Sequence, residues 1–94
     1  MVSRRLEAKV RRDFAATAAD ETLRRLEALT LPLAERQSRE RIQAAIVLLA
    51  GGDRDRFDRY AGLAEADWRD VLVFSGLGEG DWPARLDDEL GPPA

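Results

Sequence analysis

The stretch Ser38–Asp53 reads SRERIQAAIVLLAGGD, and it decides the fold. Its second half, Ala44 to Ala50, is seven apolar residues without a break. An apolar run alone does not separate a buried strand from a buried helix, but its flanks favour a helix. Ser38 is a suitable N-cap, and Gly51-Gly52 supplies a stop that tolerates left-handed dihedrals. Because a helix that is apolar on every side lies inside a bundle, we expect a central buried helix over about residues 35–51, starting between Leu33 and Ser38.

The residues before this helix also have a helical pattern. From Ser3 to about Ala19 an apolar side chain recurs every fourth position, as expected of an amphipathic helix. Asp20 is a suitable N-cap for a further helical segment, which ends at Leu31-Pro32 because the residue before a proline is pushed out of the α region. Alanine favours continuation, so the pattern leaves open whether residues 3–29 form one helix or two.

Three aspartates mark helix starts after the central helix. Asp53 precedes a segment that ends near residue 64, Asp67 precedes residues 68–75, and Asp81 precedes a short helix with a proline in its first turn. The sequence therefore predicts an all-α fold, a small single-domain bundle of about five helices. We expect one domain over residues 1–94, with an N-terminal helical arm over 1–30 and a bundle core over 35–91.

Composition excludes several classes of protein. An apolar fraction of 45% is ordinary for a globular domain and excludes a wholly disordered chain. The 94 residues include no cysteine and no histidine, which removes disulfides, thiolate metal sites and the commonest general base. No apolar run approaches the roughly 20 residues of a membrane span, and charges stand where a signal peptide needs its apolar region. We expect a cytoplasmic protein without a cofactor.

The net charge of −3 hides an asymmetry along the chain. Residues 1–12 carry five cations against one acid, a net of +4, whereas residues 51–94 carry eleven acids against five arginines, a net of −6. General nucleic-acid binding needs a broad positive footprint, so nucleic acid is not an expected partner. The cations of the first segment are Arg4, Arg5, Lys9, Arg11 and Arg12.

Two motifs superficially suggest ligand sites. Asp53, Asp55 and Asp58 resemble the start of a calcium loop, but Phe57 occupies the fifth position, and Asp58 stands where the loop needs a glycine. The glycines of residues 76–80 resemble a phosphate cradle, but no strand precedes them and no lysine follows. We therefore predict a helix N-terminus at the first motif and a flexible connector at the second, and no metal or cofactor site.

Trp68, Arg69 and Asp70 are the candidate interaction residues. We expect Asp67 to cap the helix that carries them, and Asp70 to complete a capping box. Trp68 then leans on the bundle, while Arg69 points outward and is available to a carboxylate of a partner. Both carboxylates stay ionised beside Arg69 and the helix N-terminus, which argues against general acid catalysis.

Three pieces of the chain carry a resemblance to a group of small bacterial proteins. They are Glu40-Arg41-Ile42-Gln43-Ala44-Ala45, then Leu49-Ala50-Gly51-Gly52-Asp53, then Asp67-Trp68-Arg69-Asp70-Val71-Leu72. The order resembles an ERxQ-A helix that ends in GGD and is followed by a DWRD helix, over residues 38 to 77. The Asp81-Trp82-Pro83 ending resembles an actinobacterial branch. The resemblance implies a small bacterial helical protein and brings no catalytic residue with it.

These observations favour a non-enzymatic protein–protein interaction module, which either self-associates or docks on another protein. One alternative is a small ligand-binding or enzymatic domain with a site near Trp68–Asp70, which the lack of histidine, cysteine and a convergent polar set disfavours. A second alternative is binding to an anionic surface or nucleic acid through the basic N-terminal helix.

Overall fold

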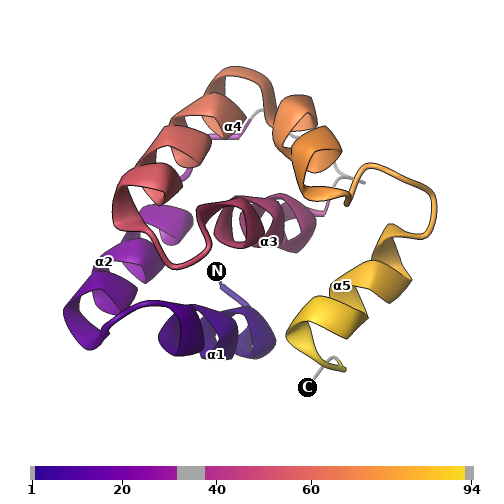
Figure 1. Ribbon diagram of the computed structural model, residues 1–94. Helices are drawn as coiled ribbons and strands as arrows, with labels where there is room; N and C mark the ends of the chain where they lie inside the picture. The colour runs from indigo at the N-terminus through magenta and orange to yellow at the C-terminus, as the bar shows by residue number, and fades with distance from the viewer. Residues whose placement is uncertain (1, 32–37, 93–94) are drawn as a thin grey trace.

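The computed structural model describes residues 2–31 and 38–92, and within them the chain forms five helices and no strand. In chain order these are α1 (Arg4–Asp13), α2 (Ala16–Glu27), α3 (Arg39–Ala50), α4 (Arg54–Ser75) and α5 (Trp82–Leu90). Figure 1 shows α3 in the middle of the view, with the other four helices around it. The prediction of a small all-α domain is confirmed. None of these helices is long and apolar enough to cross a membrane.

Helix α3 has the largest buried share of the five helices, since seven of its twelve residues are buried. The Ser38 hydroxyl caps it by accepting a hydrogen bond from the Arg41 amide at 3.1 Å, and Gly51 ends it in the left-handed region at φ +57°. Leu48 and Leu49 keep part of their surface exposed, so α3 is not enclosed on every side as predicted. The part of the predicted helix before Ser38 lies outside the described residues.

The N-terminal half forms two helices, and the break falls before Asp20. Helix α1 ends at Asp13 and α2 begins at Ala16, with Phe14 and Ala15 both extended. The prediction of one helical run to about Ala19, with Asp20 as a cap, is therefore wrong, because Asp20 lies inside α2. The turn allows Phe14 to bury its ring against Phe57, with centroids 6.1 Å apart in an edge-to-face arrangement.

Helix α4 consists of two helices joined at a kink. Asp67 has φ −154° and ψ 94° inside the run from Arg54 to Ser75, so the backbone leaves the α region for one residue. The predicted helix start at Asp67 is confirmed, although the first segment continues past residue 64 to the kink. The second half of α4 then runs at an angle to the first (Figure 1).

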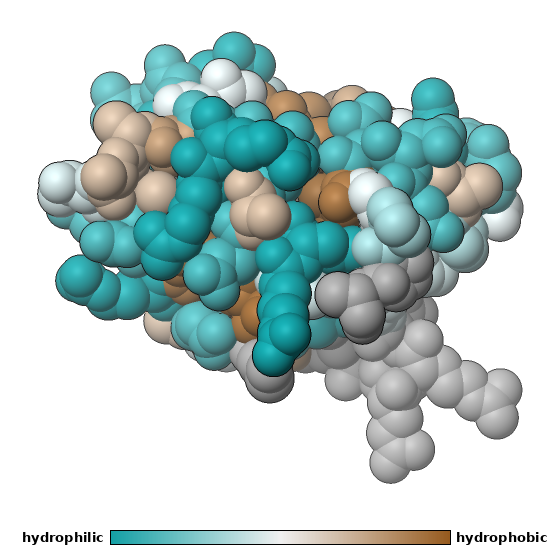
Figure 2. Space-filling model, turned by 90° about the horizontal axis from the view of Figure 1, so that it is seen from below, coloured by the Kyte–Doolittle hydropathy of each residue, from teal (hydrophilic) through white to brown (hydrophobic). Residues whose placement is uncertain are grey.

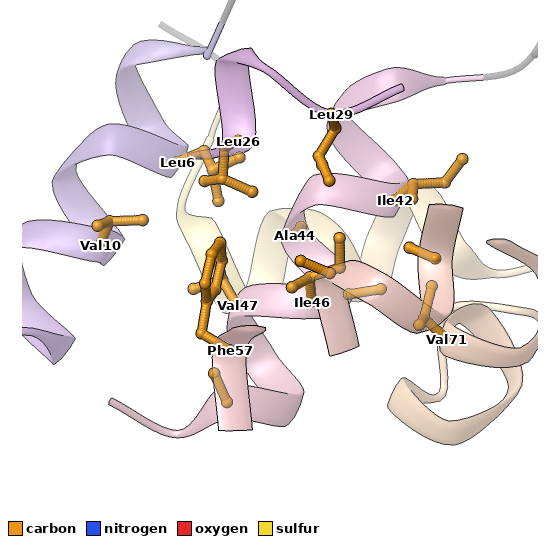
Figure 3. Close-up of a cluster of buried hydrophobic side chains, with 14 of the residues drawn as sticks. Leu6, Val10, Leu26, Leu29, Ile42, Ala44, Ile46, Val47, Phe57 and Val71 are labelled. Atoms are coloured by element: carbon orange, nitrogen blue, oxygen red, sulfur yellow. The ribbon is translucent and has the colours of Figure 1, made fainter. Parts of the chain in front are cut away.

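All five helices contribute to one core. Leu6, Leu26, Ile46 and Phe57 come from α1, α2, α3 and α4, and each has no exposed surface. Figure 3 shows these side chains converging between the helices. Leu86 adds α5 to the same cluster. The closest packing joins α3 to α4, which follow each other across the turn at Gly51-Gly52.

Candidate interaction surface

The second half of α4 begins with the predicted interaction residues. The carboxylate of Asp67 accepts a hydrogen bond from the Arg69 amide at 3.2 Å, which is the N-cap bond expected of a helix that starts at residue 68. Trp68 is half-buried and packs against the core. The tryptophan therefore belongs to the bundle, and it anchors this short helix.

Arg69 points into solvent, with 74% of its side chain exposed. Its guanidinium lies on Asp67, with Nε 3.0 Å from Oδ1 and Nη2 3.3 Å from Oδ2. This contact lowers the pKa of Asp67 and raises that of Arg69. Asp70 is exposed and makes no side-chain hydrogen bond to any described residue, so the predicted capping box does not form.

Val73 and Phe74 are the two large apolar side chains that the structure leaves exposed, by 69% and 60%, among the described residues. They follow Val71 and Leu72, which are buried. Successive helical residues turn by about 100° around the axis, so four apolar residues in a row on a surface helix cannot all face the core. That signal was present in the sequence, and our sequence-based reasoning missed it.

Each of the five N-terminal cations has a different environment, so they do not form one basic face. The Arg5 side chain is only 10% exposed, and its guanidinium contacts Glu40 at 2.7 Å and Asp87 at 2.5 Å. Lys9 pairs with Asp13 at 3.0 Å. Among the described residues, Arg4 and Arg12 make no ion pair or hydrogen bond and are exposed.

Arg11 remains half-exposed while pairing with Glu7 at 3.3 Å and with Asp20 at 3.1 Å. The long side chains on this face of α1 surround a hollow of about 410 Å³, which is open to solvent. We call it the α1 hollow, and its lining residues are Arg4, Glu7, Ala8 and Arg11. In Figure 2 the face that carries α1 and α5 is mostly hydrophilic, with small hydrophobic areas between.

The two motifs that suggested ligand sites have structural roles. Asp53 caps α4 by accepting a hydrogen bond from the Arg56 amide at 3.0 Å, and Asp58 pairs with Arg54 at 3.0 Å. No group of three or more acidic residues in the described part of the chain is placed to hold a metal ion. In the glycine-rich connector, the Gly76 carbonyl accepts a hydrogen bond from Arg85 at 3.0 Å.

Trp82, the second tryptophan, packs at the start of α5. It is half-buried, and the Arg41 guanidinium lies 4.6 Å from its ring centroid, within the range of a cation–π contact. Arg41 also donates a hydrogen bond to the Leu77 carbonyl at 2.8 Å. The contact between the Trp82 ring and Arg41 therefore joins α5 to α3, and only part of the ring is exposed to a partner.

Comparison with known proteins places the chain in no family. No family model matches it, and neither a curated protein nor a solved structure does. The resemblance of its ERxQ-A, GGD and DWRD pieces to small bacterial helical proteins therefore stays a prediction.

Proposed function

We propose that this chain is a non-enzymatic interaction module that docks on another protein surface through the second half of α4. The docking surface, called the α4 patch, comprises Arg69, Asp70, Val73 and Phe74. The observation that carries the proposal is the exposure of Val73 and Phe74, side by side on a helix whose start is capped and anchored.

Helix geometry joins these four residues into one surface. Residues four apart are neighbours on a helix, so Arg69 lies beside Val73 and Asp70 lies beside Phe74. Single exposed apolar side chains are normal on proteins, but an aromatic residue with an aliphatic neighbour and a charged border is typical of an interface centre. The Asp67 cap and the packed Trp68 hold the patch in place, which lowers the entropy lost on binding.

The charges within the patch indicate the chemistry of the partner. Asp70 is exposed and makes no side-chain hydrogen bond to any described residue, whereas the exposed Arg69 beside it is paired with Asp67. A partner with an apolar pocket and a cation at its border complements this surface, since opposite charges favour association.

The same geometry gives little support to a catalytic site near Trp68–Asp70. The pKa of Asp67 is lowered, chiefly by the hydrogen bond from the Arg69 side chain. A general acid needs a raised pKa, so Asp67 does not suit that role. The Trp68 ring packs against the core, so it does not form the wall of an open site. Val73 and Phe74 are exposed and are not part of the buried core, so both side chains can contact a partner.

A photo-crosslinking amino acid at position 74, in the cells that express the protein, tests the proposal. The matched control carries it at Gly62, an exposed position on the first half of α4 with open space around it. We expect a protein captured at 74 and not at 62, which then binds the purified chain. Val73→Asp should weaken that binding by about tenfold or more, and Gly62→Asp should not. Equal capture at both positions, or binding indifferent to Val73→Asp, contradicts the proposal.

A further inference from the structure

Helix α5 is weak on its own. It has nine residues, and isolated helices shorter than about 12–15 residues are only marginally stable in water. The Asp81 side chain makes no capping hydrogen bond at its start. Its last turn holds no basic residue but three acids, Asp87, Asp88 and Glu89, at the end where the helix dipole favours cations. The segment therefore needs contacts with the rest of the molecule to remain helical.

Arg5 of α1 supplies the cation that the end of α5 lacks. Its guanidinium donates a hydrogen bond to the Asp87 carboxylate at 2.5 Å. It also donates one, at 3.0 Å, to the carbonyl of Gly91, the C-cap residue of α5. A positive charge at a helix C-terminus is stabilising, and here it comes from a residue more than 80 positions away in the sequence. Helix α5 is therefore completed by α1.

The apolar attachment of α5 is small. Leu86 and Leu90 are its buried residues, and Trp82 is half-buried, with its ring against Arg41 of α3. Of the five helices, α5 has the fewest contacts with the others. In Figure 1 it lies at the edge of the molecule, joined to α4 by the connector of residues 76–81, which contains three glycines. When α5 moves away, the contacts among the other four helices stay in place.

From these features we infer that α5 is a latch, which leaves the bundle and unfolds as one unit, hinged at residues 76–81, while α1–α4 stay folded. Segments with few buried apolar contacts open at a lower free energy than the core, and α5 loses its C-terminal cation once it leaves Arg5. Release exposes the apolar side chains of a segment, residues 81–91, that carries four acids against one arginine, a net of −3. This conformational device goes beyond the proposed function, which uses the α4 patch.

Trp82 reports on the latch when it is the only tryptophan. The Trp68→Phe variant of the full chain leaves Trp82 alone, so its fluorescence follows α5, whereas far-UV circular dichroism follows mainly the other four helices. We expect the fluorescence midpoint in urea to lie below the circular dichroism midpoint by about 0.5 M or more, with a smaller m-value, because less surface is exposed. Coincident transitions would show that α5 unfolds only with the rest, and would overturn the inference.

A charge reversal in the last turn of α5 tests the physical cause. Glu89→Lys, at an exposed position, places a cation at the helix C-terminus and should move the fluorescence midpoint to higher urea, while the circular dichroism midpoint stays unchanged. Glu79→Lys makes the same charge change at an exposed position before the helix and should not raise either midpoint. Both variants are made in the Trp68→Phe chain. A shift of both probes together in Glu89→Lys contradicts a separate latch.

Hydrogen exchange of the original chain needs no substitution and provides an independent measurement. The amides of α5 should exchange at least about tenfold faster than the slowest amides of α3, and their rates should change little with low urea, because a small opening exposes little surface. The α3 amides should accelerate steeply with urea, since they exchange through global unfolding. Equal protection and equal urea dependence in the two helices would contradict the latch.

Discussion

Replacing Arg4 or Arg5 of α1 by glutamine should have very different effects on the stability of the fold, because Arg4 is a surface charge and Arg5 joins three helices. Arg4 and Arg5 are adjacent on α1, and glutamine at either position removes one positive charge. Arg4 is exposed, with no ion pair or hydrogen bond to any described residue. Arg5 donates to both oxygens of Glu40, at 3.0 and 2.7 Å, and also to Asp87 and the Gly91 carbonyl. One side chain thus ties α1 to the start of α3 and to the end of α5.

The size of the effect follows from the burial of each partner. A hydrogen bond to a charged group contributes ~1.5–3 kcal/mol, and Arg5 makes two to Glu40, whose side chain is 25% exposed. Asp87 is 50% exposed, so its pair adds only ~0–1 kcal/mol. The bonds share one guanidinium and are not additive, and we expect Arg5→Gln to lower the free energy of unfolding by about 2–4 kcal/mol. Arg4→Gln should stay within ~0.5 kcal/mol of the original chain.

Urea and thermal unfolding followed by circular dichroism measure this difference. For a domain of this size each kcal/mol lowers Tm by about 4–8 °C, so a loss of about 2–4 kcal/mol should make Arg5→Gln melt roughly 8–30 °C lower. Equal melting curves for Arg4→Gln and Arg5→Gln would refute the reasoning, because the two variants differ only in the contacts that they lose. Both arginines would then behave as exposed surface charges.

The pH dependence of the same difference is a second check. The hydrogen bond from Arg5 is the largest cause that lowers the pKa of Glu40 in the folded state. A carboxylate with a lowered pKa stabilises the fold fully above its ordinary value of about 4.3, and loses that contribution as the pH falls through the lowered pKa. The gap between the original chain and Arg5→Gln should therefore be full at neutral pH and shrink below about pH 4. A gap that widens on acidification contradicts the assignment.

Three further predictions concern the core, the turn after α3 and the kink in α4. Ile46→Ala, at a fully buried position, should cost ~2–5 kcal/mol in urea unfolding with an unchanged m-value; a loss below ~1 kcal/mol would contradict its burial. Gly51→Ala and Gly52→Ala should each cost ~1–2 kcal/mol, because both residues have left-handed backbone angles. Gly52→Ala should cost ~1–3 kcal/mol more, because its Cβ would lie 2.5 Å from a backbone oxygen of α1; equal unfolding midpoints of the two variants would refute this clash. Asp67→Ala should cost ~0.5–2 kcal/mol as a lost cap, whereas Arg69→Ala should shift the melting midpoint little, since its pair is exposed; the reverse order would make Arg69 the anchor.

The local structures of this chain could be predicted from its sequence alone. The all-α class follows from apolar spacing, and the ends of α3 follow from Ser38 and Gly51, each of which acts within a few residues of its own position. Asp53 and Asp67 cap helices as predicted for the same reason. A cap needs only the amides of the next turn, so neighbouring residues suffice to predict it.

Contacts between distant parts of the chain could not be predicted in this way, because they depend on how the helices pack. At the break between α1 and α2, the Phe14 ring packs against the ring of Phe57, which lies 43 positions later in the sequence. The residues next to Phe14 give no sign of this contact, so they do not predict the break. In the sequence Arg5 cannot be distinguished from the other N-terminal cations. Its role as an anchor follows from its ion pairs with Glu40 and Asp87, which are distant in the sequence. Val73 and Phe74 are as apolar as the two residues before them, and the direction from which α3 covers α4 determines which pair is buried. Burial and ion pairing depend on distances through space, and those distances arise only when the helices pack.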